Sequence, residues 1–491
     1  MKKKDNKKRK NMALVKFSKF LWLISLVFMA ILGYFIYDAN VLPMKYFGLI
    51  LCVFVVLISL HGIIVLKKNT KVGVLIVIDL LTFVFMTIET LAIIKINDTI
   101  SFLRNNLGLK YETNIYNIVV NKNSGYYSIS DIENKDVYTF KDLDDFEKVE
   151  EILKKKVAVN ILYDNNMIEL LESVKDNNER IIMVNSGNYD AMVETDENYE
   201  KSVRIIDTVE IKTKVNTIDN NLNITKEPFV VYLSGIDTRS GTLPSRSLSD
   251  VNIVMAINPK TKELLMVHIP RDYYVPIHGI GINDKLTHTG TIGGVNLTMQ
   301  TIEDLLEIDI PYYVRVNFNS VTNLVDAIGG ITVNSDVDYS FTCWTNTSCV
   351  IKPGLNELDG KCALAFARER HAYNTGDRHR GENQEQLIEK IIDKVTSSTL
   401  IYKYNDILNA LDGTFETSLT TDDILGLVKM QIDDMSSWKV SSYNVTGSGA
   451  MLPTYSYPNL NLYVMNPDFN TVNEAVNKLD QVLGTVNEET N

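Results

Sequence analysis

Three apolar runs near the N-terminus constrain this 491-residue chain more than any other feature. They cover about Phe17–Tyr37, Met44–Leu66 and Val72–Ile94, and each is long enough to cross a bilayer as a helix. A cleaved signal peptide is the alternative for the first run, but no small-residue cleavage site closes it and two more runs follow. The sequence therefore predicts three transmembrane helices, with the lipid bilayer as a partner.

Basic residues predict the orientation of these helices. Residues 1–20 contain nine Lys/Arg and one Asp, and Lys67, Lys68 and Lys71 follow the second run. Because basic loops stay on the cytoplasmic side, we expect a cytoplasmic N-terminus and an external location for everything after about Ile96. Ionisable residues inside the spans are functional candidates by default, but helix packing explains them equally well and we assign no function to His61, Asp79 and Glu89.

The charge balance differs between the two parts of the chain. Of 49 Lys/Arg and 61 Asp/Glu, residues 1–96 hold 14 and 4, which leaves 35 and 57 in the remainder, a net charge of −22. An acidic ectodomain of this kind argues against a nucleic acid as partner.

Composition divides the chain into predicted domains 1–96, 97–225 and 226–485. In the middle domain, short apolar runs alternate with helical patterns, which predicts a small α/β accessory domain. Its expected strands are Ile115–Val120, Val157–Leu162, Arg180–Val184 and Val203–Val215, and its expected helices are Leu143–Leu153 and Met167–Val174.

The last domain also alternates strands with helices, which predicts a mostly parallel or mixed sheet covered on both faces. The expected strands are Phe229–Gly235, Val251–Asn258, Leu264–Ile269, Tyr312–Phe318 and Ile331–Val333, and the expected helices are Thr298–Leu306, Ser320–Ile328 and an amphipathic Asp423–Met435.

The four cysteines differ in their surroundings. Cys52 falls in a span and Cys362 in an apolar helical pattern, where both are expected to be small core residues. Cys343 and Cys349 bracket WTNTS on the outer side, where disulfides persist. We favour a disulfide between these two that closes a hairpin.

An arginine cluster follows the apolar helical pattern that contains Cys362. Asp377 is a good N-cap for a helix that reaches Val395, and Arg380 and Gln384 share one face of that helix. Arginines near a helix N-terminus suit a phosphate, although a solvated charged loop is the alternative. The cluster comprises Arg368, Arg370, Arg378 and Arg380.

Polar residues also collect at predicted strand ends, where open α/β sheets bind ligands. Asp237 follows the first strand, Asp250 precedes the second, and Arg271-Asp272 follow the third. Turn chemistry alone explains single aspartates at such places. As a set, however, two carboxylates suit Mg²⁺ (with Mn²⁺ as the alternative), and the arginines suit phosphoryl transfer. The sequence contains no P-loop, nucleotide fingerprint or zinc motif.

The blocks YLSGIDTR, SDVNIVMAINPKTKELLMVHIPRDYYVPI, NDKLTHTG, YYVRVNFNSVTNLVDAIGGI and LDGKCALAFARERH…GDRHRGENQ resemble the LytR–CpsA–Psr family of cell-wall glycopolymer ligases. The resemblance runs in the family's order from about Phe229 to Ile392, and the three spans and accessory domain resemble its capsule-type members. It implies a protein anchored in the bacterial cell membrane, whose extracytoplasmic catalytic domain is a three-layer α/β/α sandwich with an apolar tunnel for a polyprenyl chain. It also implies Mg²⁺ and transfer of a polyprenyl-diphosphate-linked glycopolymer to a peptidoglycan sugar hydroxyl.

The resemblance assigns roles to residues of this chain. Asp237 and Asp250 match the metal-holding carboxylates. Residues that match the diphosphate-binding set are Arg271, Arg368, Arg370, Arg380 and Gln384. Asp377 matches an acid near the head group. Arg271, Asp272 and Asp377 are the catalytic candidates, the two acids being the carboxylates to test as general base.

Two positions depart from the family pattern. Leu248 stands where members commonly have an arginine, and Arg246 is the candidate to replace it at the diphosphate. Glu382 stands where many members have a second arginine. Both changes reduce positive charge at the site.

Two rival functions remain beside the transferase. A polyprenyl diphosphate hydrolase would use the same metal and arginines with water as nucleophile. A regulatory protein that only binds lipid-linked intermediates would not require the paired carboxylates Asp237 and Asp250.

Overall fold

The structure is a computed structural model, and the chain forms two compact units that are described separately: Met1–Leu107 with Thr420–Ser436, and Gly108–Leu419 with Ser437–Asn491. The described residues are 2–39, 42–67, 70–106, 111–140, 146–214, 222–236, 243–336, 339–342, 348–369, 377–397, 399, 403, 406–407, 409–410 and 415–485.

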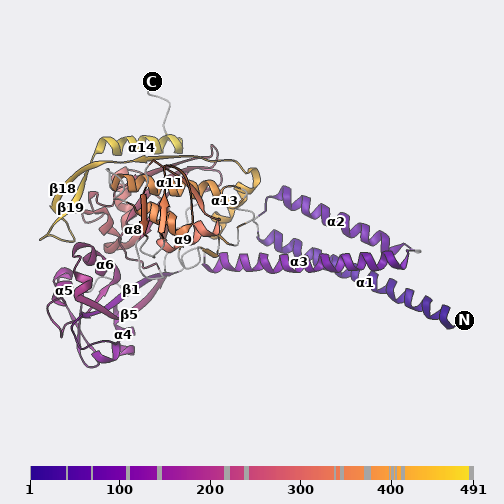
Figure 1. The fold of residues 1–491 in the computed structure, drawn as a ribbon, viewed down its shortest axis with the longest axis horizontal. Coiled ribbons are helices and arrows are strands. Elements are labelled where there is room, and N and C mark those ends of the chain that lie inside the picture. Colours follow the sequence, from indigo (N-terminus) through magenta and orange to yellow (C-terminus); the bar gives the residue numbers. More distant parts are fainter. Residues whose placement is uncertain are drawn as a thin grey trace, which may run out of the picture. The chain divides into compact units, whose positions relative to one another are not determined.

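Long apolar helices make up most of the first unit, and they contact one another along their length (Figure 1). Their membrane-length apolar parts are Met12–Ala39, Met44–Leu66 and Val72–Asp98. The prediction of three such helices is therefore confirmed, while the cytoplasmic N-terminus and external remainder stay predictions. The full helices are α1 (Lys2–Ala39), α2 (Met44–Leu66) and α3 (Val72–Asn106).

Polar side chains inside this bundle join neighbouring helices. Ser18 Oγ donates a hydrogen bond to Asp79 Oδ2 at 2.6 Å, and Thr82 Oγ1 lies 3.0 Å from His61 Nδ1. Glu89 is 1% exposed. These contacts support helix packing as the role of the ionisable residues in the spans.

The predicted amphipathic helix near the C-terminus is present as α13 (Thr421–Asp434). Thr420 and Asp423 form a capping box at its start. The helix belongs to the compact unit of the membrane helices, where Lys45 Nζ lies 3.0 Å from Asp433 Oδ1. The sequence predicted that this segment continues the last domain, whereas in the structure it groups with the membrane helices.

In the second unit, residues 111–214, which the sequence predicts to belong to an accessory domain and which keep that name below, form a sheet with the order β3-β2-β4-β1-β5. Alternate residues of β1 point to opposite faces: Ile118 packs with α4, whereas Val119 packs with α5 and α6. Every predicted element is present, but α6 was not predicted. The elements are β1 (Tyr111–Asn121), β2 (Asp136–Thr139), α4 (Phe146–Lys156), β3 (Asn160–Tyr163), α5 (Met167–Ser173), β4 (Ile181–Asn185), α6 (Ser186–Thr195), α7 (Tyr199–Ser202) and β5 (Val203–Lys214).

The C-terminal domain (residues 226–485 without 420–436) is built on a mixed sheet with the order β16-β11-β6-β7-β8-β17. Strands β6, β7 and β8 pair antiparallel, β11 is parallel to β6, and β17 is parallel to β8. The bounds of the sheet strands are β6 (Phe229–Ile236), β7 (Val251–Asn258), β8 (Glu263–Ile269), β11 (Tyr312–Asn317), β16 (Phe415–Thr417) and β17 (Lys439–Asn444).

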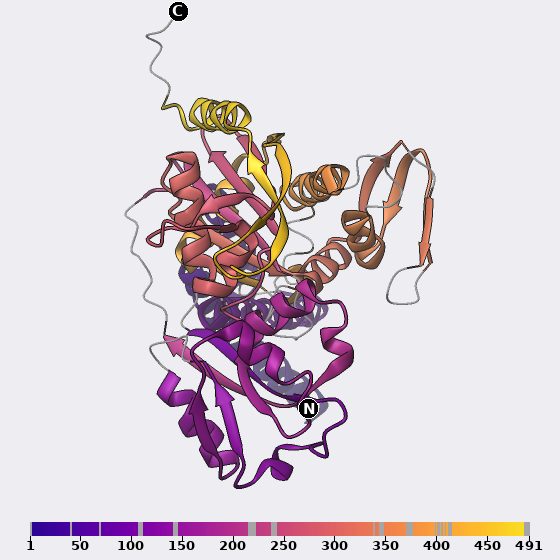
Figure 2. The ribbon, with the colours of Figure 1, turned by 90° about the vertical axis from the view of Figure 1, so that its left-hand side faces the viewer.

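Helices cover both faces of this sheet, so the predicted three-layer α/β/α sandwich is confirmed. On one face, Val254 and Val267 pack with α8 (Leu286–Leu306) and α14 (Phe469–Leu483). On the other face, Ile253 and Met266 pack with α11 (Asp377–Val395). Figure 2 shows the accessory domain (purple) against the C-terminal domain (pink to yellow).

The remaining elements of the C-terminal domain flank the sandwich. The short helices α9 and α10 share a core with the apolar side of α11, whereas β9 and β10 contact α8, and β19 contacts β9. These elements are β9 (Tyr274–Pro276), β10 (Asn283–Lys285), α9 (Phe318–Ala327), β12 (Ile331–Ser335), β13 (Tyr339–Thr342), β14 (Ser348–Ile351), β15 (Gly354–Leu358), α10 (Gly360–Arg368), β18 (Gly447–Pro453) and β19 (Asn461–Pro467).

Candidate functional site

The antiparallel pairing of β7 and β8 brings Asp250 and Arg271 together. Asn252 pairs with Ile269, so continuing that register by two residues places Asp250 opposite Arg271. Arg271 Nη1 donates a hydrogen bond to Asp250 Oδ1 at 2.5 Å. The Asp250 N–H also donates to the Gly235 carbonyl at 2.9 Å, next to the end of β6. The predicted convergence of strand ends is thus present on this edge of the sheet.

Within the described residues, three carboxylates approach the Arg271 guanidinium. Besides Asp250, Glu194 Oε1 lies 2.7 Å from Nη2 and Asp272 Oδ2 lies 3.9 Å from Nε. Burial alone would lower the pKa of Arg271, but Asp250, Glu194 and Asp272 outweigh burial and raise it. Lys285 Nζ in turn lies 2.9 Å from Asp272 Oδ1. Arg271 is therefore a permanently charged side chain held from several sides.

Backbone contacts fix the segment that carries Arg271. The Thr287 N–H donates to the Arg271 carbonyl at 2.9 Å, and the Met465 N–H donates to the Asp272 carbonyl at 2.7 Å. On the Asp250 side, the buried Ser249 Oγ donates to Asn252 Oδ1 at 2.8 Å. The strand end carrying Arg271 and that carrying Asp250 are therefore both anchored.

A second predicted site residue, Arg368, is the last residue of α10. This helix starts on a fixed base, because Asp359 Oδ1 accepts from the Cys362 N–H at 2.8 Å and Asp326 Oδ1 accepts from the Gly360 N–H at 2.7 Å. A Cβ on Gly360 would lie 2.1 Å from the Thr322 carbonyl oxygen. Only glycine therefore allows α9 and α10 to approach this closely.

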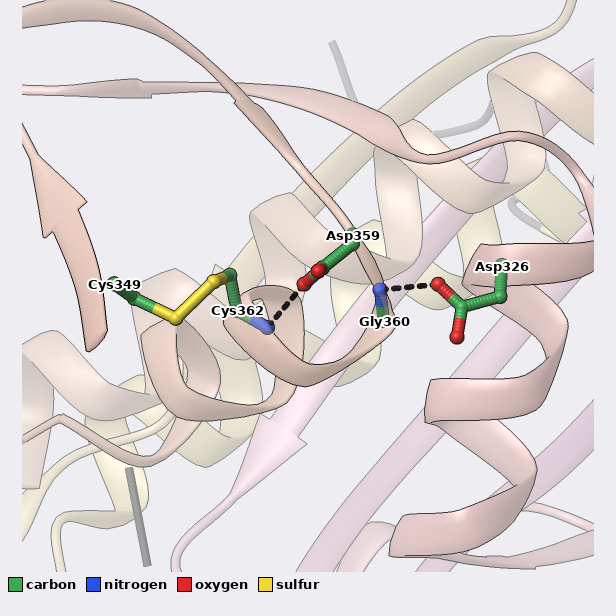
Figure 3. The surroundings of a disulfide bond; sticks show 5 residues. All are labelled: Asp326, Cys349, Asp359, Gly360 and Cys362. Atoms are coloured by element: carbon green, nitrogen blue, oxygen red, sulfur yellow. Dashed lines mark hydrogen bonds between the residues drawn. A yellow bond between two sulfur atoms is a disulfide. The ribbon is translucent and has the colours of Figure 1, made fainter. Parts of the chain in front are cut away.

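A disulfide joins Cys349 of β14 to Cys362 of α10, with an S–S distance of 2.00 Å (Figure 3). The predicted pairing of Cys349 with Cys343 is therefore wrong, as is the prediction of Cys362 as a core thiol. Sequence proximity favoured Cys343, whereas the fold brings the first turn of α10 next to β14. Cys343 itself lies outside the described residues. The disulfide ties the helix that carries Arg368 to the neighbouring hairpin.

Packing orients Arg368 at the end of that helix. Its guanidinium carbon lies 4.3 Å from the centre of the Phe318 ring, a distance typical of a cation–π contact. Gln384 of α11 donates from Nε2 to the Ala367 carbonyl at 3.4 Å. Gln384 and Arg368 are thus brought to adjoining positions, as the resemblance implies.

The start of α11 lies beside the end of β8 that leads to Arg271. A Cβ on Gly381 would lie 3.3 Å from the ring of His268. Arg380, which precedes Gly381, is thereby placed at the same end of the sheet. The predicted helix from Asp377 to Val395 is confirmed by the bounds of α11.

Glu385, also on α11, is a buried acid next to this region. Burial raises the pKa of Glu385, although hydrogen bonds with Ser442 and Asn444 oppose the shift. This acid was not a candidate from the sequence.

Some predicted residues cannot be placed at the site. Asp237 and Arg370 lie outside the described residues, as does the side chain of Asp377. Leu248 is buried at 8% exposure. The positive charge of Arg246 acts on Glu112 of the accessory domain, where it opposes the increase in the pKa of Glu112 that burial causes. The role of Arg246 as a diphosphate ligand stays a prediction.

Carboxylates at the sheet edge are the candidate ligands for a metal ion. Among the residues that the structure describes, His, Cys, Asp and Glu side chains do not gather in threes around a common point. Asp250 nevertheless offers hard oxygen ligands at the end of β6 from which Asp237 follows, and such ligands fit Mg²⁺. Asp250 therefore fits a divalent cation, whereas a site shared with Asp237, which lies outside the described residues, stays a prediction.

Sequence reasoning missed several residues that shape this site. Glu194 belongs to a helix that was not predicted, and its partner Arg271 is 77 positions away. Lys285 could have been suspected, because it lies in the NDKLTHTG block. Phe318 gave no signal beyond ordinary core hydrophobicity.

Comparison with known proteins places these residues in a family context. Residues 192–468 match the LytR_cpsA_psr family model. A polyisoprenyl-teichoic acid–peptidoglycan teichoic acid transferase TagU of Enterococcus faecalis is 37% identical over 252 residues, covering 51% of this chain and 79% of that protein. The TagU of Bacillus subtilis is 37% identical over 199 residues, covering 40% of this chain and 62% of that protein.

One solved structure is also similar to part of the chain. The crystal structure of B. subtilis TagV is 30% identical, with a TM-score of 0.45, and the match covers 53% of this chain and 98% of that one. The family model spans more than half of the 491 residues, and it contains Asp250, Arg271, Arg368 and Arg380. The chain therefore belongs to the LytR_cpsA_psr family.

Proposed function

We propose that this protein is a membrane-anchored phosphotransferase that moves a glycopolymer from a polyprenyl-diphosphate carrier to a peptidoglycan sugar hydroxyl. The observation that carries the proposal is the half-buried ion pair of Arg271 and Asp250 at one edge of the sheet, inside the family-matched segment. The names of the relatives specify teichoic acid as the polymer for those proteins. For this chain we propose the wider class of lipid-linked glycopolymers.

The reaction exchanges one bond at phosphorus for another. The acceptor hydroxyl oxygen attacks the phosphorus that carries the polymer, and the bond from this phosphorus to the bridging oxygen breaks. Polyprenyl phosphate leaves with that electron pair, and a phosphodiester links the polymer to the wall. Positively charged donors that face the phosphate oxygens stabilise the negative charge of the transition state.

Arginines supply those donors. Arg271 has a guanidinium fork that suits paired phosphate oxygens, and it is held in place by Asp250 at the sheet edge and by Glu194 of α6. Arg368 and Arg380 approach from α10 and α11, with Gln384 beside them. Arg370 and Arg246 complete the proposed set by resemblance.

A general base must take the proton of the acceptor hydroxyl. Asp272 and Asp377 are the carboxylates we propose to test. One oxygen of Asp272 is paired with Lys285 at 2.9 Å, which keeps this acid next to Arg271. Asp377 begins α11, the helix that also carries Arg380 and Gln384.

Mg²⁺, with Mn²⁺ as the alternative, is the cation we propose for Asp237 and Asp250. A divalent cation at this position would supply charge neutralisation for the diphosphate. Asp250 would then be shared between the cation and Arg271, which keeps both positive groups against the same substrate oxygens.

The apolar carrier chain needs a surface within the same domain. On the α11 side of the sheet, apolar side chains of the central strands are only partly buried, although helices cover both faces of the sheet. These side chains are Leu233, Val251, Met255 and Ile257. We propose that the polyprenyl chain lies along this face, so that its diphosphate reaches the strand ends.

A transfer assay tests the proposal. The full-length protein in lipid vesicles receives a lipid-diphosphate saccharide, MgCl₂ and peptidoglycan oligomers, and mass spectrometry identifies the products. The proposal predicts a saccharide joined to the oligomer through a single phosphate, with loss of this product on chelation. Release of lipid monophosphate without a joined product would show that the protein is a hydrolase and contradict the transferase proposal. Tight lipid binding without any turnover would favour the binding-protein alternative.

A further inference from the structure

Helix α6 of the accessory domain is docked on the C-terminal domain at both of its ends. At its start, a Cβ on Gly187 would lie 3.0 Å from the Arg246 carbonyl. At its end, Tyr457 of the C-terminal domain packs into the core of the accessory domain with Tyr189 and Met192 of this helix. Glu194 lies next to Thr195 in the last turn. Because both ends of α6 are docked, the helix holds the Glu194 backbone at a fixed position relative to Arg271.

Strand β1 of the accessory domain, beside α6, also contacts the C-terminal domain. The Ser245 N–H donates to the Thr113 carbonyl at 2.7 Å, and the Ser245 hydroxyl donates to Asn114 Oδ1. Ser245 and Asn114 are both buried. Because backbone and buried side chains take part, the two domains share a built interface at the candidate site.

The charge around Arg271 is unfavourable for an anionic substrate. Arg271 and Lys285 contribute two positive charges, whereas Asp250, Glu194 and Asp272 contribute three negative ones. The described cluster thus has a net charge of −1 before a diphosphate arrives. Even with the Mg²⁺ proposed at Asp250, a diphosphate that binds Arg271 must displace a carboxylate from its N–H donors, because two anions at this distance repel.

Glu194 is the carboxylate best suited to be displaced. Asp272 is held by Lys285, and Asp250 is fixed at the start of β7. Among the described residues, Glu194 hydrogen-bonds through its side chain only to Arg271, and that side chain is 31% exposed. A carboxylate and a phosphate compete for the same N–H donors of a guanidinium.

We infer that Glu194 is a positioning residue of the donor site, a placeholder that occupies Arg271 Nη2 until the diphosphate replaces it. Through this residue the accessory domain sets the affinity for the donor and favours release of the less highly charged monophosphate product. The inference rests on the proposed function, because it takes Arg271 as a diphosphate ligand.

The test measures binding of farnesyl diphosphate and farnesyl monophosphate to the full-length protein in detergent by calorimetry, at a fixed MgCl₂ concentration. Glu194→Gln removes the charge and keeps the shape, whereas Glu194→Asp keeps the charge. Asp196→Asn is the matched control, because Asp196 pairs with Lys175 at 2.7 Å and its side chain is 27% exposed. Thermal unfolding of each variant checks the fold.

We expect Glu194→Gln to bind the diphosphate about 3- to 10-fold more tightly, which corresponds to roughly 0.7–1.4 kcal/mol. The gain should be smaller for the monophosphate, and Glu194→Asp and Asp196→Asn should stay near the wild-type affinity. A merely structural role of Glu194 would weaken binding instead of strengthening it.

Other outcomes separate the inference from the function. Unchanged or weaker diphosphate binding by Glu194→Gln, together with lost binding by Arg271→Ala, would overturn the placeholder and leave the donor site intact. Unchanged binding by Arg271→Ala would overturn both.

Discussion

Two arginines of the candidate site are held by different physical means. Arg271 is fixed by charge, since carboxylates from β7, from its own segment and from the accessory domain approach its guanidinium. Arg368 is placed by covalent and packing contacts, namely a disulfide in its helix and the Phe318 ring under its guanidinium. Charge occupies the N–H donors that a phosphate would use, whereas stacking uses the flat face of the guanidinium.

The difference has a consequence for mutations. Loss of a carboxylate should act on Arg271 by changing charge, with little effect on folding. Loss of the disulfide or of Phe318 should act on Arg368 by loosening its support. The following variants break one arrangement at a time, from the largest expected effect to the smallest.

Asp250→Asn tests the charge-held side. The substitution removes a proposed metal ligand and the partner of Arg271 Nη1 at 2.5 Å. We expect the transfer rate to fall by about 10²–10³-fold, the usual loss for a key electrostatic group. Asp164→Asn is the control, because Asp164 Oδ2 pairs with Arg180 Nη2 at 2.5 Å within the accessory domain. A wild-type rate for Asp250→Asn in the transfer assay would remove this carboxylate from the site.

The double variant Cys349→Ser/Cys362→Ser tests the packing-held side. The disulfide closes a loop with a sequence separation of 13 residues, so its loss should lower the free energy of unfolding by about 3 kcal/mol. Chemical denaturation measures this change, and a reductant should reproduce it in the wild type. Cys52→Ser should leave both stability and reductant sensitivity unchanged. Equal stability of the double variant and the wild type would show that the covalent link does not support α10.

Phe318→Leu tests the ring contact of Arg368 while leaving the disulfide of its helix intact. The variant keeps an apolar side chain but removes the ring 4.3 Å from the Arg368 guanidinium. A cation–π contact contributes about 1 kcal/mol, so we expect KM for the lipid donor to rise about fivefold with kcat nearly unchanged. Steady-state kinetics at varied donor concentration provide the measurement. A fall in kcat with constant KM would contradict the proposed role in ground-state binding.

Glu385→Gln should give the smallest effect, and it depends on pH. Burial raises the folded-state pKa of Glu385 above its unfolded value of about 4.3. Between those two pKa values the folded state binds more protons, so the stability of the wild type falls as pH rises. The glutamine variant lacks this penalty. It should match the wild type near pH 4 and be more stable at pH 8, measured by denaturant unfolding at both pH values. A larger stability gain at pH 4 than at pH 8 would reverse the assigned direction.

The sequence predicted the sheet of the C-terminal domain well. The strands β7 and β8 were expected within one residue of their bounds, because each is a continuous apolar run between turn residues. Antiparallel pairing of these strands then brings Asp250 and Arg271 together. Strand-end chemistry was therefore accessible from sequence patterns.

Other parts of the site were not accessible in this way. Helix α6, with the sequence SGNYDAMVET, has no amphipathic period and contains Gly187 near its start. Its formation depends on packing against β1 and on docking to the C-terminal domain. The disulfide was assigned to the wrong cysteine, because sequence spacing carries no information on how α10 turns back to β14. Contacts between distant segments are what the linear pattern omits.

Arg271→Ala compared with Arg180→Ala tests the central claim most directly. Each arginine side chain is 18% exposed and lies 2.5 Å from an aspartate, but Arg180 belongs to the accessory domain. The readout is phosphodiester product formed by the full-length protein from a lipid-diphosphate saccharide and peptidoglycan oligomers. The account predicts that Arg271→Ala loses the product while remaining folded and that Arg180→Ala retains it. Transfer at the wild-type rate by Arg271→Ala would contradict the assignment of this edge of the sheet as the donor site.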